Sequence, residues 1–396
     1  MKILVANIGS TSFKFRLFDF GTGEAELASG GVERIGHAGG MMSYQPAGSA
    51  KRSGPCQCAD HGAAIAACLQ AMVESAVLAD AAALDAVAFK AVMAGDCEPI
   101  CFVDDALIRR MEFYSPAAPA HNPAYVAAMR SFRDTLKGTP LVAAFEPGFH
   151  RTVPARRQCY AIAPAWQEKF GIRRYGYHGA SHRFVAERTR ELMGEQARRI
   201  ISCHLGGSSS ICAIRDGQSV ANSMGFSPQS GLPQSRRVGE FDPFALALVA
   251  RETGLSLQEM LVELGERAGL AGMSGTSGDA RDIEDAAAKG EARSILAQEA
   301  FATGVRDYIG AYLVELGGAD AICFTGGIGQ KSPVLRSMIL NGLEFAGIAL
   351  DLARNEKMKD EGRIDAAGSA TALWAMPTNE ELIVARQAKE LIEKRT

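Results

Sequence analysis

The chain has 396 residues, 47% of them hydrophobic, so it is long enough to form two hydrophobic cores. Its formal net charge of −3 provides no broad basic surface, which argues against nucleic acid as a partner. No segment approaches the ~20 consecutive apolar residues of a membrane-spanning helix, and the nine scattered cysteines favour reduced thiols in a cytoplasmic protein over a disulfide framework.

The first predicted element is a strand followed by a turn of small residues. In the segment ILVANIGSTSFKFRLFDFG (3–21) an apolar strand leads to Asn7, a Gly/Ser/Thr turn follows, and a second strand begins. The segment IISCHLGGSSSICAIRDG (200–217) repeats this order, with His204 where the first segment has Asn7. The shared order, spacing and turn chemistry favour a duplicated domain, and a chance similarity between two hairpins is the alternative.

The rest of the chain alternates between predicted strands and helices. Apolar runs predict strands at 84–89, 140–145, 198–205 and 319–324. Helical periodicity and capping residues predict helices at 122–138 (with Asn122 as the N-cap), 181–194, 241–254, 256–269, 291–316 and 379–395. The Gly-, Ser- and Pro-rich residues 36–60 are expected to form a loose loop. This alternation indicates an α/β fold with parallel or mixed sheets covered by helices on both faces.

Three segments of small residues follow predicted strands, at 7–12, 204–210 and 325–332. Glycine permits positive φ and close approach of a ligand, so backbone N–H groups and hydroxyls in such loops can contact phosphate oxygens. None of the three matches the P-loop or the full dinucleotide-binding pattern, and ordinary tight turns use the same residues. Because three such loops occur in one chain, and two of them belong to the repeat, a nucleotide-binding site is favoured.

Imidazole, guanidinium and carboxylate groups occur close to these loops in the sequence. His178 and His182 flank a Gly-Ala-Ser turn before a helix, Arg237 lies in a loop before another helix, and Glu146 follows the predicted strand at 140–145. Neutral imidazoles and an arginine suit phosphoryl transfer, in which the protein mainly positions groups and stabilises spread negative charge. The alternatives are structural histidines, a solvated arginine and a surface acid at a strand end.

Taken together, these segments resemble the acetate kinase family of the actin-like, sugar-kinase superfamily. The resemblance runs from MKILVANIGSTSFKF through RYGYHGASHR, ISCHLGGSSS, SMGFSP and SGDARDIE to PTNEELIVAR, which covers essentially the whole chain. It implies an α/β fold of two duplicated actin-like (ribonuclease H-like) domains with mixed sheets flanked by helices. The expected boundaries are 1–150 and 151–381, with a C-terminal helix at about 382–396 that packs back on the first domain.

The resemblance also implies an activity. Members of this family transfer the γ-phosphoryl group of ATP reversibly to a short carboxylate such as acetate or propionate, which yields ADP and an acyl phosphate. They require Mg²⁺ and work as homodimers. The expected partners of this chain are therefore a nucleotide, a small carboxylate and a second copy of itself, with neither nucleic acid nor a membrane among them.

The functional positions of the family can be assigned to residues of this chain. The catalytic positions correspond to Glu146, His178 and Arg237. The substrate-binding positions correspond to Lys90, Val92, Ala120, Tyr177 and Pro228. The nucleotide-binding positions correspond to His204, Leu205, Gly206, Gly207, Ser208, Asp279, Ala280, Arg281, Gly327, Ile328, Gly329, Gln330 and Lys331. The magnesium positions correspond to Asn7 and Glu380, whose hard oxygen atoms suit this ion.

The sequence departs from the family pattern around the acceptor. Lys90 replaces the usual arginine, so a point charge replaces a planar bidentate fork. Glu146 replaces the catalytic aspartate, which moves the carboxylate outward by a methylene group. Ala120 replaces a leucine and Tyr177 a phenylalanine, which suggests a roomier and more polar pocket for a larger or more polar acid. A kinase that phosphorylates a hydroxyl group and a non-catalytic ATP-binding sensor are the alternatives.

Overall fold

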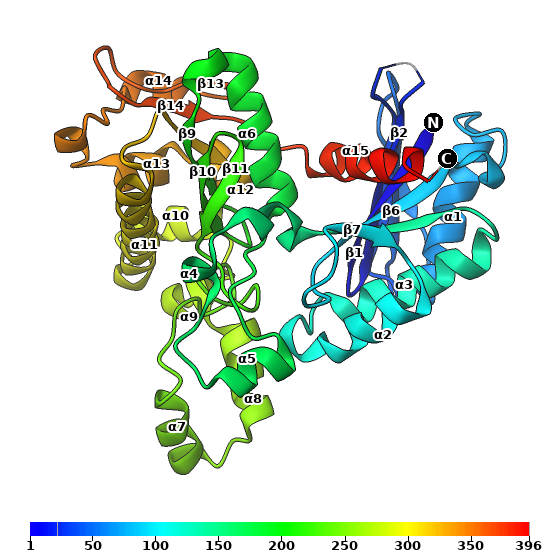
Figure 1. The fold of residues 1–396 in the computed structure, drawn as a ribbon, viewed down its shortest axis with the longest axis horizontal. Coiled ribbons are helices and arrows are strands. Elements are labelled where there is room, and N and C mark those ends of the chain that lie inside the picture. Colours follow the sequence, from blue (N-terminus) through cyan, green and yellow to red (C-terminus); the bar gives the residue numbers. More distant parts are fainter. Residues whose placement is uncertain (22, 396) are drawn as a thin grey trace. The chain divides into compact units, whose positions relative to one another are not determined.

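The computed structural model describes residues 1–21 and 23–395, which form two compact units (Figure 1). The first unit comprises Met1–Gly148 and Asn379–Thr396, and the second comprises Phe149–Thr378. The C-terminal segment therefore belongs to the same unit as the N-terminus. Each unit is built on one mixed β-sheet.

The sheet of the first unit has eight strands in the order β5-β4-β3-β2-β1-β6-β8-β7. Its strands are β1 (Lys2–Gly9), β2 (Ser12–Asp19), β3 (Ala25–Glu33), β4 (Met41–Pro46), β5 (Arg52–Pro55), β6 (Ala86–Ala91), β7 (Ile100–Phe102) and β8 (Leu141–Phe145). Its α-helices are α1 (His61–Glu74), α2 (Asp105–Phe113), α3 (Asn122–Thr135) and α15 (Glu380–Glu393). Helices α1 and α3 contact each other and the β1–β3 part of the sheet, whereas α15 packs on β1, β6 and β8.

The sheet of the second unit has six strands in the order β11-β10-β9-β12-β14-β13. Its strands are β9 (Arg199–His204), β10 (Ser210–Arg215), β11 (Gln218–Asn222), β12 (Ala321–Thr325), β13 (Gly362–Arg363) and β14 (Ala372–Ala375). Its α-helices are α4 (Ala155–Gln158), α5 (Pro164–Phe170), α6 (Gly179–Met193), α7 (Ala245–Thr253), α8 (Leu257–Val262), α9 (Gly269–Ser274), α10 (Ala280–Ala288), α11 (Ala292–Leu316), α12 (Gly326–Lys331), α13 (Pro333–Leu340) and α14 (Leu352–Lys357). Buried side chains of α11 pack on β9 and β10 and form part of the core of this unit.

The two sheets confirm the duplication that the repeated hairpins predicted. Reading β3-β2-β1-β6-β8-β7 and β11-β10-β9-β12-β14-β13, both sheets have two antiparallel pairings, then two parallel pairings, then an antiparallel edge pairing. Hairpin β1–β2 of the first unit therefore corresponds to hairpin β9–β10 of the second. The predicted α/β class with mixed sheets and flanking helices is correct. The 25-residue helix α11 is also as predicted, and α8 begins with a capping box of Ser256 and Glu259.

Four local predictions were wrong, each for a physical reason. Residues 36–60 contain β4 and the edge strand β5, because an edge strand tolerates Gly and Pro. Asn122 does not cap α3: its buried side-chain amide donates to the carbonyls of Met93 and Met111, both at 2.8 Å. Residues 326–331 of the third small-residue segment are helical, and the expected Gly-Ala-Ser turn at 179–181 forms the start of α6.

Two general expectations can be compared with the fold. All nine cysteines are free thiols, as their scattered positions predicted. Among the described residues, no helix has the length and apolar character that crossing a membrane requires.

Candidate functional site

The first unit places charged groups at the carboxyl ends of neighbouring parallel strands. Strands β1 and β6 are parallel, and Ala6 pairs with Phe89. The residues that follow this pair, Asn7 on β1 and Lys90 on β6, therefore lie on neighbouring strands at the same level. Strands β6 and β8 pair with Ala91 opposite Phe145, which places Glu146 at the adjoining end of β8. Ligand sites in open α/β sheets form at this edge of the strands. The sheet therefore gathers three of the residues assigned from the sequence.

Lys90 forms an ion pair with Glu380, the first residue of α15. Both side chains are largely buried, with exposed fractions of 18% and 11%. Burial opposes the charge of Lys90, but the carboxylates of Glu380, Glu146 and Glu381 outweigh it and raise the pKa of the lysine. Lys90 is therefore a permanent cation surrounded by acids, and the ion pair ties the C-terminal helix to β6.

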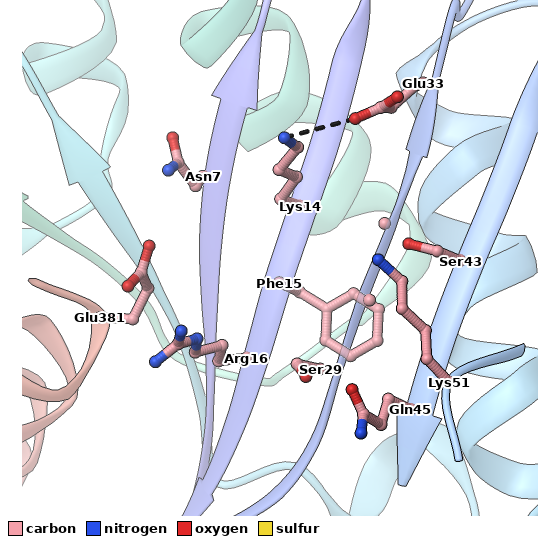
Figure 2. Close-up of a pocket in the computed structure, with 12 residues that line it drawn as sticks. Asn7, Lys14, Phe15, Arg16, Ser29, Glu33, Ser43, Gln45, Lys51 and Glu381 are labelled. Atoms are coloured by element: carbon pink, nitrogen blue, oxygen red, sulfur yellow. Dashed lines mark ion pairs between the residues drawn. The ribbon is translucent and has the colours of Figure 1, made fainter. Parts of the chain in front are cut away.

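Carboxylates near Lys90, together with the side-chain amide of Asn7, are candidate ligands for a magnesium ion. Asn7 and Glu381 are among the residues that line one pocket of about 300 Å³ (Figure 2). The hydroxyl of Tyr125 lies 3.4 Å from the Asn7 side-chain oxygen. Among the described residues, no group of three His, Cys, Asp or Glu side chains is arranged as a metal cage. An amide and nearby carboxylates, without a full cage, fit Mg²⁺, which keeps several waters and uses phosphate oxygens as ligands.

Glu146 is buried, with an exposed fraction of 7%, at the point where β8 ends and a 3₁₀ turn begins. It contributes to the raised pKa of Lys90 and so lies within electrostatic reach of that ammonium group. The assigned substrate residues of this unit differ in exposure: Val92 is buried next to Lys90, whereas Ala120 is exposed before α3. A buried acid that acts electrostatically on a buried cation is typical of a functional site, whereas a solvent-exposed acid at the end of a strand is not.

In the second unit, His178 immediately precedes α6 and has a positive φ of 56°. Its Nδ1 atom lies 2.8 Å from the Ser210 hydroxyl, which also lies 2.8 Å from Nε2 of His182. Nδ1 of His182 lies 2.8 Å from the hydroxyl of Ser202. The His204 ring stacks on His178 with centroids 4.2 Å apart. The β9–β10 hairpin therefore orients the imidazole of His178 through Ser210.

Hydrogen-bond donors and acceptors restrict the protonation of this network. Burial, together with His150 and His204, holds the pKa of His182 well below its ordinary value, so this ring is neutral. A neutral imidazole donates from one nitrogen only, and the Ser210 hydroxyl has only one proton. When Nε2 of His182 donates to Ser210, Ser210 donates to Nδ1 of His178, so a neutral His178 carries its proton on Nε2.

Arg237, which is assigned to catalysis, donates hydrogen bonds both to an assigned nucleotide-binding residue and to an assigned substrate-binding residue. Its Nη1 atom donates to the Ser208 hydroxyl at 3.3 Å and to the Pro228 carbonyl at 3.3 Å. The Gln234 side-chain oxygen accepts from Arg237 at 3.2 Å and from Ser208 at 2.7 Å. Burial lowers the pKa of Arg237, which nevertheless remains a cation. The guanidinium is held in place by neutral oxygens, so its charge is available to an anion.

Hydrogen bonds connect the nucleotide segments assigned from the sequence, in part through Ser235, which lies outside them. Ser235 N donates to Gly207 O at 3.1 Å, and the Ser235 hydroxyl donates to Gly278 O at 2.8 Å. Ile328 N donates to Leu205 O at 2.9 Å. Residues 204–208 thus lie between the segment that precedes α10 and the helix α12.

Side chains in these segments already have partners. Asp279 caps α10, and its bonds to Arg281 lower the pKa of the carboxyl to about 2. Gln330 donates to Asp360 O at 3.1 Å, and Lys331 is exposed. Gly326 has a φ of +77°, and a Cβ atom there would lie 2.5 Å from Leu205 O, so glycine is required at this close approach.

Tyr177 differs from its expected role as a polar wall of the acceptor pocket. Its ring is buried, and its hydroxyl donates to Phe226 O at 2.6 Å. The hydroxyl therefore satisfies a loop carbonyl, and the expectation that it makes the pocket more polar is not supported. Sequence reasoning also missed Ser210, Gln234 and Tyr125, because serine, glutamine and tyrosine carry no motif of their own at these positions.

The buried side chain of His150 contacts the backbone of Tyr177, and its lowered pKa leads to a prediction about stability and pH. Its Nε2 atom donates to Tyr177 O at 2.9 Å, and its Nδ1 atom accepts from the Ser219 hydroxyl at 2.8 Å. Burial lowers the pKa of His150 to about 4, so the folded protein keeps the ring neutral where an unfolded chain is protonated. Between this pKa and the unfolded value of about 6.5, the unfolded state binds more protons, so stability falls as the pH falls.

We therefore expect the free energy of unfolding to decrease on acidification through this window, by up to about 3 kcal/mol from His150 alone. Urea denaturation at a series of pH values measures the slope, and the His150→Gln variant should show a flatter dependence than the parent. Equal slopes in the two proteins would show that His150 is protonated in the folded state.

The repeated strand order, with segments of small residues at the carboxyl ends of β1, β9 and β12, is that of the actin-like ATPase fold of the solved structures described below. The model of the acetokinase family matches residues 2–386. The chain belongs to this family. Its members transfer a phosphoryl group to a carboxyl group and use ATP and Mg²⁺.

Individual relatives support the family. The chain is 39% identical to an acetate kinase of Clostridium botulinum (strain Kyoto) and 37% identical to one of Anoxybacillus flavithermus; the alignments cover 100% and 98% of both chains. Among solved structures, a propionate kinase from Francisella tularensis matches with a TM-score of 0.91 at 30% identity over 98% of both chains. An acetate kinase from Porphyromonas gingivalis matches with a TM-score of 0.88 at 31% identity over 99% of both chains.

Proposed function

We propose that this protein transfers the γ-phosphoryl group of ATP reversibly to a short-chain carboxylate, either acetate or propionate or a larger, more polar acid, to form an acyl phosphate. The observation that carries the proposal is the group of Asn7, Lys90 and Glu146 at the carboxyl ends of three adjacent strands. A buried cation among acids provides a place for a carboxylate next to a place for Mg²⁺.

The first unit would bind the acceptor. Lys90 attracts the acceptor carboxylate as a point charge, and its ion pair with Glu380 keeps the long side chain in one position. Glu146 orients the acceptor or the water shell of the metal. Asn7 and Glu380 would hold Mg²⁺ through oxygen atoms. When bound, the ion neutralises charge on the phosphate oxygens.

The second unit would bind the nucleotide and stabilise the transferring group. Residues 204–208, 279–281 and 327–331 hold ATP, and the hydrogen bonds between these segments support that assignment. The Nε2–H of His178 and the guanidinium of Arg237 donate to the equatorial oxygens of the phosphoryl group, where charge develops.

The chemical step requires no proton transfer. An oxygen of the acceptor carboxylate attacks the γ-phosphorus, and a new O–P bond forms as the bond to the β,γ-bridging oxygen breaks. ADP leaves with that electron pair. Positioning and electrostatic stabilisation therefore supply the catalysis.

A panel of carboxylic acids tests this function. Each acid is incubated with ATP, Mg²⁺ and hydroxylamine, and the acyl hydroxamate is measured. We expect at least one short acid to give ATP-dependent hydroxamate. A phosphorylated product stable to acid and hydroxylamine would instead indicate a hydroxyl kinase, and tight ATP binding without turnover would indicate a sensor; either result refutes the proposal.

Lys90 provides a prediction about acceptor choice. We expect Lys90→Arg to raise kcat/KM for acetate about tenfold, or about 1.4 kcal/mol, because a bidentate guanidinium orients a carboxylate better than an ammonium group. Steady-state kinetics with acetate measure the change, and Lys90→Met is the matched variant that removes the charge and should abolish acceptor binding. An unchanged value in Lys90→Arg would assign acceptor choice to Ala120 and Tyr177 instead.

We also propose that the protein is a homodimer, as its family resemblance implies, with α7 and α8 in the interface. In Figure 1 these helices extend from the sheet of the second unit. Four large apolar side chains on or beside these helices are exposed, with exposed fractions of 84% for Phe244, 54% for Leu248, 61% for Leu257 and 48% for Leu261. Such a cluster is typical of an interaction surface.

We expect light scattering to give twice the 42.0 kDa chain mass. The Leu248→Glu/Leu257→Glu variant should be a monomer; a monomeric parent contradicts this proposal.

We place the protein in a reducing compartment, the cytoplasm. Its nine cysteines are free, and burial raises the pKa of the Cys212 and Cys323 thiols to about 12. Thiols with such high pKa values are unreactive and suit a protein that contains no disulfides.

A further inference from the structure

A second pocket lies in the second unit, apart from the groups described above. Its volume is about 540 Å³, within the range of about 300–1,000 Å³ of small-molecule sites. Arg157 and Arg174 line it together with the aromatic rings of Tyr160 and Tyr308. None of these residues belongs to the catalytic, substrate or nucleotide positions.

The pocket is lined by three arginines and by one acid, Glu240. Arg156 and Arg157 share one acid, Glu315, at 3.4 Å and 3.1 Å from their guanidinium nitrogens. Arg174 forms no ion pair with any described residue, and its guanidinium carbon lies 4.6 Å from the centre of the Tyr160 ring. An arginine that stacks on an aromatic ring keeps its outer N–H groups directed away from the ring and available to an anion.

The remaining walls indicate what else a ligand must carry. Tyr308 and Tyr312 contribute aromatic rings, and Ser223 and Asn222 contribute polar groups. A site lined by arginines and aromatic rings fits a small organic anion that has a carboxylate or phosphate group and an apolar part.

The backbone of Phe226 connects this pocket to the assigned substrate residue Tyr177. The Tyr160 hydroxyl accepts from Phe226 N at 2.9 Å, and the Tyr177 hydroxyl donates to Phe226 O at 2.6 Å. Gly225 packs so closely that a Cβ atom there would lie 2.1 Å from the Tyr160 hydroxyl. A displacement of Tyr160 therefore moves Phe226, and with it the support of Tyr177 and the loop that contains Pro228.

We propose that this pocket is a regulatory site for a small organic anion, which binds to Arg174 and Arg157 and changes acceptor affinity through Tyr160 and Phe226. The binding part stands independently of the proposed function, whereas the effect on the acceptor rests on it.

Calorimetry of the full chain saturated with Mg·ADP tests the binding part, with inorganic phosphate and succinate as probes. We expect at least one probe to bind and Arg174→Glu to weaken that binding about tenfold or more, since it reverses a charge that contacts the anion. Arg190→Glu, an exposed arginine of α6, is the matched control and should bind as the parent does. Equal binding by Arg174→Glu and the parent, or no binding of either probe, overturns the site.

Kinetics with the best acceptor test the coupling. We expect the bound anion to change the acceptor KM about fivefold or more, and Tyr160→Phe to bind the anion without this change. The anion effect is taken within each protein as the ratio of the acceptor KM with and without the anion, so a basal change in Tyr160→Phe does not enter the comparison. An unchanged KM in the parent with anion bound refutes the coupling. A chain that binds the anion at Arg174 but phosphorylates no acid refutes the proposed function and leaves the site supported.

Discussion

The Glu146→Gln variant is expected to lose about 10³-fold in kcat while it binds nucleotide as tightly as the parent. Glutamine preserves the size of the side chain but removes the charge, and Glu146 is a buried acid within electrostatic reach of Lys90. This loss is expected because, in the proposed function, the charge of Glu146 acts on the acceptor or on the water shell of the metal in the transition state. Steady-state kinetics and calorimetry with ATP measure the two quantities.

The matched control is Glu112→Gln, an exposed acid of the same unit paired with Arg130, which should leave kcat unchanged. Glu146→Asp tests the length of the side chain separately, because ångström-scale placement governs rate. A kcat for Glu146→Gln within about tenfold of the parent would mean that the charge of Glu146 is not used in the reaction.

Arg237→Ala should lower kcat by about 10³-fold or more, the range found for arginines that stabilise a transferring phosphoryl group. Its guanidinium is fixed by the Ser208 hydroxyl and the Pro228 carbonyl, so it presents a pre-oriented charge. Arg237→Lys keeps the charge but loses the planar fork, and it should recover only part of the activity.

The neighbouring Arg236 is an exposed residue that provides the closest control. Arg236→Ala should have nearly the parent kcat, since its charge is solvated. If the two alanine variants lose activity equally, the assignment of Arg237 to the phosphoryl group is wrong.

The duplication and the elements around the site could be predicted from the sequence. The hairpins at Asn7 and His204 share a strand, a polar residue and a small-residue turn, and the two sheets have the same order. Periodicity located α11 and the strands β6, β8, β9 and β12 because long apolar patterns depend on local spacing alone.

The contacts that define the chemistry could not be predicted. The Lys90–Glu380 pair joins residues 290 positions apart, and no local pattern encodes such a contact. Ser210 lies between His178 and His182 only because the β9–β10 hairpin packs beside α6. The direction of the Tyr177 hydroxyl depends on the loop at Phe226, which the sequence alone does not place.

The central claim is that a carboxylate oxygen attacks the γ-phosphorus of ATP. It is tested most directly with a carboxylate acceptor labelled in both oxygens with ¹⁸O, in the presence of ATP, Mg²⁺ and hydroxylamine. Hydroxylamine attacks the acyl carbon of the product, so the phosphate that leaves retains the bridging oxygen. We predict that ³¹P NMR will show a single ¹⁸O atom in the released phosphate, in proportion to the hydroxamate formed. Unlabelled phosphate, or no hydroxamate with any acid, would contradict the claim.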